Sequence, residues 1–190
     1  VTGTSVDEHH NPTVHDIINV INKYLSYLSR NQLIVLRSTV YPGVVEIIDG
    51  LLASKIGKMK VAFCPERIVQ GKGVEEIFDL PQIISGTSTA AENEAAELFL
   101  TVTKKVVRLK PMEAEVAKLM TNAWRYLEFA AANQFYMMCE SQGLDFYKIF
   151  NGLREDYPRA KHFAKPGLTA GPCLFKDTMV FSEPQIKFPE

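Results

Sequence analysis

Near the end of the sequence, the stretch GPCLFKDT at residues 171–178 places three reactive side chains close together. Cys173 becomes a nucleophile once its thiol loses a proton, and a neighbouring cation favours that loss. Lys176 is near enough in sequence to supply the cation, and Asp177 can orient a lysine or a water molecule. A buried cysteine beside a surface ion pair is the alternative interpretation. The stretch therefore predicts thiol chemistry only if other parts of the chain supply matching groups.

A second candidate group lies on a long predicted helix, residues 111–141. Lys118 and Asn122 are four residues apart, so they share one face of that helix, and Glu115 lies on the same face. An ammonium and an amide aimed at one point can stabilise an oxyanion. A solvated helix face is the alternative that the sequence leaves open.

A third group follows two predicted strands. Arg37, Ser38 and Thr39 close the first strand, and Glu66 follows Pro65 at the end of the second. The carboxyl ends of strands are where an α/β sheet places its ligand-binding groups, and a carboxylate there can act as a general base. An ion pair between Glu66 and Arg67, or another surface cation, is the alternative. The other cysteines, Cys64 and Cys139, are interpreted as core residues.

Apolar runs and helical periodicity alternate through the first hundred residues, and this alternation predicts an α/β fold with a parallel sheet covered by helices. Pro111 begins the long helix, and a helix at 145–153 and an ordered loop at 154–172 follow. The expected domains are residues 1–110, 111–179 and an irregular tail at 180–190. The expected strands are 33–39, 60–66, 82–88 and 104–110, and the expected helices before the long one are 13–30, 43–57 and 89–103.

Composition narrows the class of protein. The 190 residues are 46% hydrophobic with a net charge of −1, which favours a packed soluble domain and argues against nucleic-acid or membrane binding. Three widely spaced cysteines fit a reducing compartment, and we expect a cytoplasmic protein. His9 and His10 are adjacent and the other two histidines are isolated, so no metal site is expected.

Four motifs together carry a family resemblance. LRSTVYPG, CPERIVQGKG, EAEVAKLMTNAWRY and GPCLFKDT occur in this order, on the expected elements. The set resembles the nucleotide-sugar 6-dehydrogenases, which include UDP-glucose, UDP-N-acetylmannosamine and GDP-mannose dehydrogenases, up to about Thr178. The resemblance implies the second half of a Rossmann-like parallel sheet followed by an all-helical middle domain with one long helix.

The resemblance also implies roles for the candidate residues. The family oxidises the terminal primary alcohol of a UDP-sugar twice, with NAD as cofactor, to a uronic acid. Cys173 would attack the aldehyde intermediate, Lys118 and Asn122 would stabilise negative charge, and Glu66 with Thr39 would position the water that hydrolyses a thioester. Asp177 would support that water or the lysine. The implied cofactor-binding residues are Thr4, Ser38, Thr39, Glu66 and Lys176.

Departures from the family pattern shape the expected activity. The family's Gly-x-Gly-x-x-Gly half-sheet and its C-terminal nucleotide-gripping domain have no counterpart in these 190 residues, so we expect a central fragment with little activity of its own. Pro172 replaces a usual glycine. Glucose, N-acetylmannosamine and N-acetylglucosamine derivatives are all open as substrates, and the form of CPERIVQGKG favours an N-acetylated hexosamine. One rival is a non-catalytic dimerisation module, because the helix at 111–141 implies a homodimer. The other is a cysteine acyl-transfer enzyme that uses Cys173 without NAD.

Overall fold

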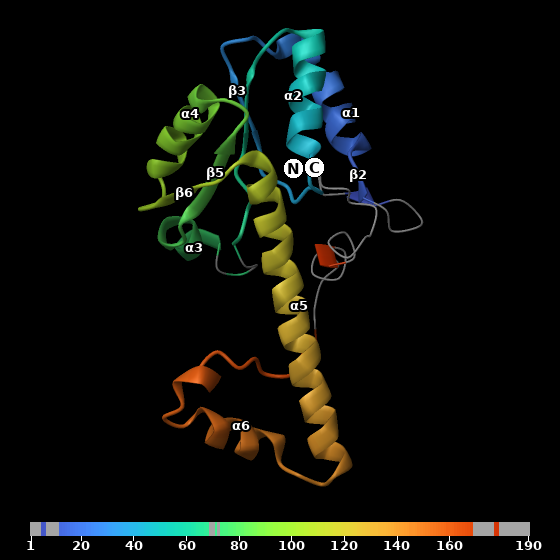
Figure 1. The fold of residues 1–190 in the computed structure, drawn as a ribbon, viewed down its shortest axis with the longest axis vertical. Coiled ribbons are helices and arrows are strands. Elements are labelled where there is room, and N and C mark those ends of the chain that lie inside the picture. The colour runs from blue at the N-terminus through green and yellow to red at the C-terminus, as the bar shows by residue number, and fades with distance from the viewer. Residues whose placement is uncertain (1–4, 7–11, 69–70, 72, 169–176, 179–190) are drawn as a thin grey trace. The chain divides into compact units, whose positions relative to one another are not determined.

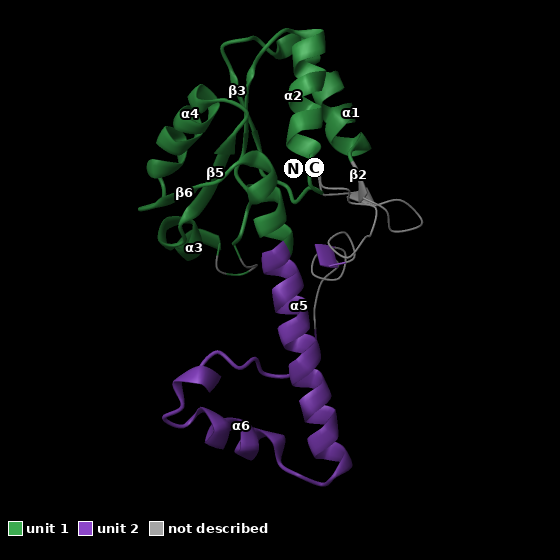
Figure 2. Ribbon diagram, viewed as in Figure 1, with its two compact units in different colours: residues 1–119, 180–190 green, residues 120–179 purple. Residues whose placement is uncertain are grey.

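The computed structural model describes residues 5–6, 12–68, 71, 73–168 and 177–178. The chain divides into two compact units, residues 1–119 with 180–190 and residues 120–179, as Figure 2 shows. Among the described residues, no helix combines the length and the apolar character needed to cross a membrane.

Unit 1 (residues 1–119 with 180–190) is built on a four-stranded sheet with strand order β3-β4-β5-β6 (Figure 1). The β3–β4 and β5–β6 pairs are parallel, whereas β4 and β5 are antiparallel. Two shorter strands pair separately and antiparallel. The strands are β1 (Ser5–Val6), β2 (Pro12–Thr13), β3 (Leu33–Leu36), β4 (Lys60–Phe63), β5 (Gln82–Gly86) and β6 (Val106–Arg108).

Helices cover both faces of this sheet. Successive side chains of β4 alternate between two cores, with Val61 and Phe63 on one side and Ala62 on the other, as the two-residue period of a strand requires. The first core contains the buried residues of α1 and α2, and the second contains Ala95, Ala96 and Phe99 of α4. The helices of unit 1 are α1 (His15–Tyr24), α2 (Val44–Lys55), α3 (Gly73–Asp79), α4 (Thr89–Leu100) and the first part of α5 (Pro111–Ser141).

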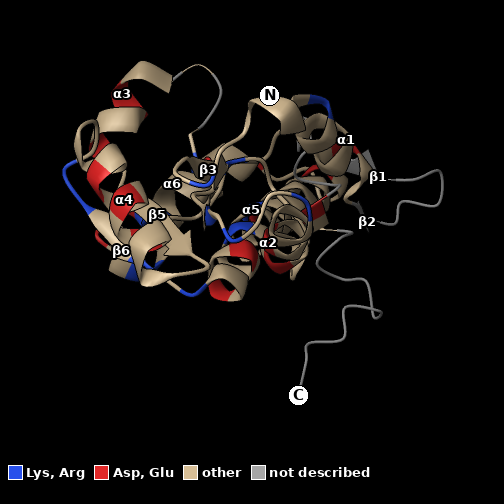
Figure 3. Ribbon diagram, turned by 90° about the horizontal axis from the view of Figure 1, so that it is seen from above, with Lys and Arg blue, Asp and Glu red and all other residues tan. Residues whose placement is uncertain are grey.

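Acidic residues along α4 also hold it to the sheet (Figure 3). Glu92 accepts a hydrogen bond of 2.5 Å from Arg108, and Glu94 pairs with Lys60. Ser88 caps the start of the helix by accepting the Ala91 N–H. These polar contacts add to the apolar contacts that α4 makes in the second core.

In unit 2 (residues 120–179), α6 (Phe146–Arg154) packs through aromatic side chains. Asp145 caps α6 by accepting the Lys148 N–H at 3.0 Å. Phe150 is 1% exposed, and its ring lies 6.1 Å from that of Phe163, which in turn stacks on Phe135 at 5.7 Å. A 3₁₀ turn at Pro158–Ala160 follows α6. The aromatic cluster supplies most of the core of this unit.

The expected fold class is confirmed, with corrections in detail. The sheet is mixed and not all parallel, because the chain leaves β4 and enters the adjacent β5 at the same end of the sheet, through the unpredicted short helix α3. The helix expected at 13–30 ends at Tyr24 and continues only as a 3₁₀ turn, Leu25–Tyr27. The long helix has the predicted bounds.

Candidate active site

The predicted polar face of α5 is buried. Glu115 is 1% exposed, Lys118 9% and Asn122 6%. Their spacing of three and four residues places them in one stripe along the helix. A solvated helix face, which the sequence left open, is therefore excluded. Burial of polar side chains has a free-energy cost unless they are hydrogen-bonded, so each of these residues needs defined partners.

Glu115 finds its partners at the start of α2. Its carboxylate accepts the N–H groups of Gly43 at 2.7 Å and Val45 at 2.8 Å. Burial raises the pKa of Glu115 to about 7, although these hydrogen bonds act in the opposite direction. The helix start at α2 would otherwise be an anion-binding site, but here the carboxylate takes its donors. Glu115 therefore anchors α5 and is not available for chemistry on a ligand.

Asn122 contacts Asp177, another predicted site residue, across 55 positions of sequence. The Asn122 amide nitrogen donates to an Asp177 carboxylate oxygen at 2.5 Å, and Asp177 is 1% exposed. A side-chain amide has two N–H donors, and this contact fixes the plane in which both lie. The structure thus brings together the motif on the long helix and the last residues of the GPCLFKDT motif.

A second amide on α5 holds the chain upstream of that motif. Asn133 donates to the Gly167 carbonyl at 2.8 Å and accepts the Gly167 N–H at 2.8 Å. Asn122 and Asn133 are close to three full helical turns apart, so both amides lie on the same side of α5, about 16 Å apart along its axis. The sequence analysis did not find Asn133, because a single asparagine in a helix is part of no recognisable local pattern.

Glu66 lies after β4 and accepts hydrogen bonds at both carboxylate oxygens. One oxygen accepts the N–H groups of Arg67 at 2.8 Å and Ile68 at 3.0 Å, and the other is paired with Arg37. A pairing with a cation, the alternative that the sequence left open, is therefore present. The Arg37 and Glu66 side chains are 33% and 41% exposed, so their attraction is worth only about 0–1 kcal/mol.

Arg37 is a further site residue, whose pairing with Glu66 was not predicted from the sequence. It follows β3, directly beside the strand that Glu66 follows, and its guanidinium also lies 4.8 Å from the centre of the Phe99 ring. Opposite charges after two neighbouring parallel strands could have indicated the pair, but only once the strand register was known.

The remaining candidates divide into two groups. Ser38 and Thr39 follow β3 and are partly exposed. Cys64 is fully buried, and burial raises the pKa of its thiol to about 12, so the interpretation of Cys64 as a core residue holds. Cys173, Lys176 and Thr4 lie outside the described residues.

A sheet with helices on both faces, followed by a helical unit that carries a buried amide–carboxylate contact, has a Rossmann-like fold with an added helical domain. Residues 1–103 match the UDP-glucose/GDP-mannose dehydrogenase family, NAD binding domain, and residues 112–187 match the central domain of the same family. The chain belongs to this family, and NAD is the cofactor of the matched domain. The central-domain match extends beyond Thr178, where the resemblance was expected to end.

Individual relatives agree with the family match. A UDP-N-acetyl-D-mannosamine dehydrogenase from Methanocaldococcus jannaschii is 34% identical over 153 residues, which are 80% of this chain and 35% of the relative. A solved UDP-D-ManNAc dehydrogenase from Pyrococcus horikoshii superimposes with a TM-score of 0.88 at 28% identity, over 99% of this chain and 46% of that one. A solved UDP-glucose dehydrogenase from Pyrobaculum islandicum superimposes with a TM-score of 0.84 at 25% identity, over 95% of this chain and 44% of that one.

The chain therefore spans about 35–45% of the length of the curated relatives that it matches. Among the described residues, hydroxyl groups that suit a dinucleotide are those of Ser38 and Thr39, at the carboxyl end of a parallel strand. The start of α2 does not suit a phosphate group, because Glu115 already accepts its N–H groups.

Proposed function

We propose that the chain carries the catalytic residues of an NAD-dependent UDP-sugar 6-dehydrogenase, which oxidises a primary alcohol through an aldehyde to a uronic acid. The observation that carries the proposal is the buried contact between Asn122 and Asp177. It joins two motifs that the family resemblance assigns to the same reaction. Cys173 lies four residues before Asp177 in sequence, so the extended chain length alone keeps their Cα atoms within about 14 Å.

The proposed second oxidation uses the thiol. The Cys173 thiolate adds to the aldehyde carbon, and the resulting oxyanion is stabilised by the Lys118 ammonium and an N–H of Asn122. The carbon–oxygen double bond then re-forms as the hydride leaves, which gives a thioester. NAD, when bound, accepts the hydride of each oxidation. The cofactor contacts proposed for this chain are those of Thr4, Ser38, Thr39, Glu66 and Lys176.

Hydrolysis completes the proposed reaction. Water attacks the thioester carbonyl, one of its protons passes to Glu66, and the Cys173 thiolate leaves. The carboxylic acid that forms releases the second proton to solvent and becomes the carboxylate product. The two backbone N–H groups and Arg37 hold the Glu66 carboxylate in one orientation, which suits the positioning of a water together with Thr39. Asp177 keeps the Asn122 amide in place during these steps.

The proposed substrate is a UDP-linked N-acetylated hexosamine. Relatives named UDP-N-acetyl-D-mannosamine dehydrogenase support this choice, as does the form of the CPERIVQGKG motif. We propose that residues 1–110 and 111–179 act as the cofactor half-domain and the helical domain, and that residues 180–190 form a tail. A cytoplasmic site of action is proposed because the two described cysteines, Cys64 and Cys139, are free thiols.

The direct test of the chemistry starts from the aldehyde. The chain is incubated with NAD and the 6-aldehyde of UDP-N-acetylmannosamine, and the protein mass is followed together with NADH absorbance. We expect a covalent sugar adduct that requires Cys173. Cys173→Ala should lose the adduct, whereas Cys139→Ala, a matched control, should keep it. An adduct of equal yield in Cys173→Ala would refute the proposal. With the UDP-sugar alcohol itself we expect little NADH from these 190 residues.

The rival proposal, a dimerisation module, is favoured by one observation on α5. Apolar residues three or four positions apart form an exposed stripe, and the first three are more than half exposed. This spacing is that of a helix seam that packs against another helix. We propose that the chain forms a homodimer through it, whether or not it is active. The stripe consists of Met120, Trp124, Leu127, Ala131, Phe135 and Met138, of which Phe135 also stacks on Phe163 within the chain.

Light scattering tests the dimer. Met138→Glu, in the stripe, should convert dimer to monomer because a carboxylate cannot be buried in an apolar seam. Met137→Glu is the matched control, since Met137 is also exposed but points about 100° away around the helix. A monomeric wild-type chain, or equal effects of the two substitutions, would reject the dimer.

A further inference from the structure

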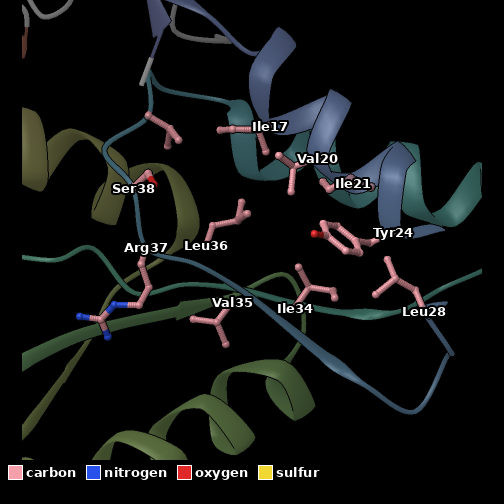
Figure 4. Close-up of a pocket in the computed structure, with 11 residues that line it drawn as sticks. Ile17, Val20, Ile21, Tyr24, Leu28, Ile34, Val35, Leu36, Arg37 and Ser38 are labelled. Atoms are coloured by element: carbon pink, nitrogen blue, oxygen red, sulfur yellow. The ribbon is translucent and has the colours of Figure 1, made fainter. Parts of the chain in front are cut away.

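The connection from β3 to α2, residues 37–43, contains Thr39 and forms neither helix nor strand. Figure 4 shows its start, where Arg37 and Ser38 follow the last residue of β3. An apolar cavity of about 540 Å³, which lies between α1 and β3, borders the connection at Ser38 and Val40. No described side chain fills this cavity, so packing from that side does not fix the course of the connection. Its hydrogen bonds therefore carry more of that task.

The two ends of this connection are hydrogen-bonded to different elements. At its start, the Glu66 N–H donates to the Arg37 carbonyl at 3.1 Å, which ties it to the residues after β4. At its end, the Glu115 carboxylate of α5 accepts the N–H groups of Gly43 at 2.7 Å and Val45 at 2.8 Å. The end of the connection is thus held by a buried side chain of another helix.

This outside contact is needed because α2 has no cap of its own. The first N–H groups of a helix lack partners within the helix, and a Ser, Thr, Asp or Asn side chain at the N-cap usually accepts one of them. The N-cap of α2 is Gly43, which makes no side-chain hydrogen bond and whose φ of +95° favours glycine. Glu115 supplies the missing acceptor from 72 positions further along the chain. The start of α2 therefore depends on α5 for its position.

The same carboxylate lies close to Lys118 and, along the chain, to Thr39. Glu115 and Lys118 are three residues apart, so they lie on one side of α5, and both belong to unit 1. Thr39 precedes Gly43 by four residues, so chain length keeps their Cα atoms within about 14 Å. Glu115 thus links the segment that carries Thr39 to the helix that carries Lys118.

We propose that Glu115 is a positioning residue of the 6-dehydrogenase reaction, whose carboxylate holds the Thr39 segment against the helix that carries Lys118. This inference rests on the proposed function and adds to it a residue that does not touch the substrate. Lys118 keeps its place on α5 without this contact, whereas Thr39 lies on an irregular connection. Hydrolysis of the thioester, which uses Thr39 with Glu66, should therefore depend on Glu115 more than formation of the thioester does.

Amide NMR spectra of the whole chain test the contact itself. Glu115→Gln replaces one carboxylate oxygen by an NH₂ group, which cannot accept a hydrogen bond. We expect hydrogen exchange of the Gly43 or Val45 amide to accelerate at least tenfold, and the Thr39 amide resonance to shift, while the amides of α4 keep their rates. An unmoved Thr39 resonance would overturn the proposal.

Glu46→Gln is the matched control for charge. Glu46 is exposed in the first turn of α2, and its charge acts on Glu115, but it is not the carboxylate that accepts the Gly43 and Val45 N–H groups. We expect the Thr39 resonance to stay in place in this variant. Equal shifts in Glu46→Gln and Glu115→Gln would assign the effect to charge and overturn the proposal.

Two rates separate positioning from stability. With NAD and the 6-aldehyde of UDP-N-acetylmannosamine, NADH absorbance reports formation of the thioester, and decay of the Cys173 adduct mass reports its hydrolysis. We expect Glu115→Gln to slow hydrolysis at least fivefold and formation less than twofold. Glu115→Ala, which removes both acceptor oxygens, should slow hydrolysis further. A mere loss of stability would lower the amount of reacting protein and leave both rate constants unchanged, and that outcome would overturn the proposal.

Failure of the proposed function has a different signature. A wild-type chain that forms no Cys173 adduct would refute the dehydrogenase chemistry, and the amide spectra would then decide alone whether Glu115 places Thr39. A wild-type chain that forms and hydrolyses the adduct at the same rates as Glu115→Gln would keep the chemistry and overturn the role of Glu115.

Discussion

The two faces of α5 are built in opposite ways. One face carries polar side chains that are buried, Glu115, Lys118 and Asn122, each 9% exposed or less. The opposite face, about half a turn around the helix, carries the exposed apolar stripe that includes Trp124 and Leu127. Helices of globular proteins normally show the reverse distribution. The polar face is fixed by hydrogen bonds within the chain, whereas the apolar face is compatible with a partner.

Because of this contrast, substitutions on the polar face should lower the free energy of unfolding much more than substitutions on the apolar face. Asn122→Ala removes the amide donor from Asp177, a carboxylate that is 1% exposed. A buried hydrogen bond to a charged group is worth about 3 kcal/mol, and we expect that loss in urea unfolding of the chain. A loss below about 1 kcal/mol would mean that this face does not hold the fold.

Glu115 should make stability depend on pH. Its folded-state pKa of about 7 exceeds the ordinary carboxyl value of 4.5, so between these values the folded state retains a proton that the unfolded state loses. The contribution is therefore full at low pH and falls as pH rises. We expect wild type to lose about 2 kcal/mol between pH 5 and 7.5 relative to Glu115→Gln.

Urea unfolding at the two pH values measures this difference. Glu113→Gln is the matched control, because Glu113 lies in the same turn of α5 but is exposed, where it accepts the Lys110 N–H. An equal pH slope in wild type and Glu115→Gln would contradict the assignment to Glu115.

Asn133 should have a smaller and local effect. Asn133→Ala removes both hydrogen bonds to Gly167, which are partly exposed to water and together worth about 1 kcal/mol. Hydrogen exchange of the Gly167 amide should accelerate about fivefold, while the amides of α6 keep their rates. If hydrogen exchange at Gly167 did not change, the two hydrogen bonds from the Asn133 side chain would not be what holds this segment.

The exposed stripe should contribute least to the stability of a single chain. Leu127→Gln replaces a side chain that is 56% exposed, and we expect a change within about 0.5 kcal/mol at concentrations where the chain is monomeric. A cost comparable to that of Asn122→Ala would show that the stripe is packed within the chain, and the contrast between the two faces would disappear.

Local signals in the sequence determined the features that were predicted well. Pro111 favours a helix start, and Gly143, with φ of +64°, ends the turn that follows α5, so the long helix was predicted with its observed bounds. The antiparallel β4–β5 pair was missed because apolar periodicity carries no information on strand direction. The register that brings Arg37 beside Glu66 also depends on tertiary structure.

The proposed site residues could be assigned only through the order of the motifs and the family resemblance. Asn122 and Asp177 are separated by 55 residues, and no local pattern relates an amide on a helix to an aspartate in a late motif. The four motifs in sequence provided that relation. By contrast, the role of Glu115 could not be predicted from its helix face, because its partners are backbone N–H groups of another helix.

The two asparagine contacts of α5 fix the distance between Gly167 and Asp177, because each of these residues is bound to a different side-chain amide of the helix. Insertion of one residue between positions 122 and 133 would rotate the second amide by about 100° and displace it by about 1.5 Å. The two ends of the segment could then no longer dock together. This part of the helix should accept changes in side chains on its outer face far more readily than any change in length.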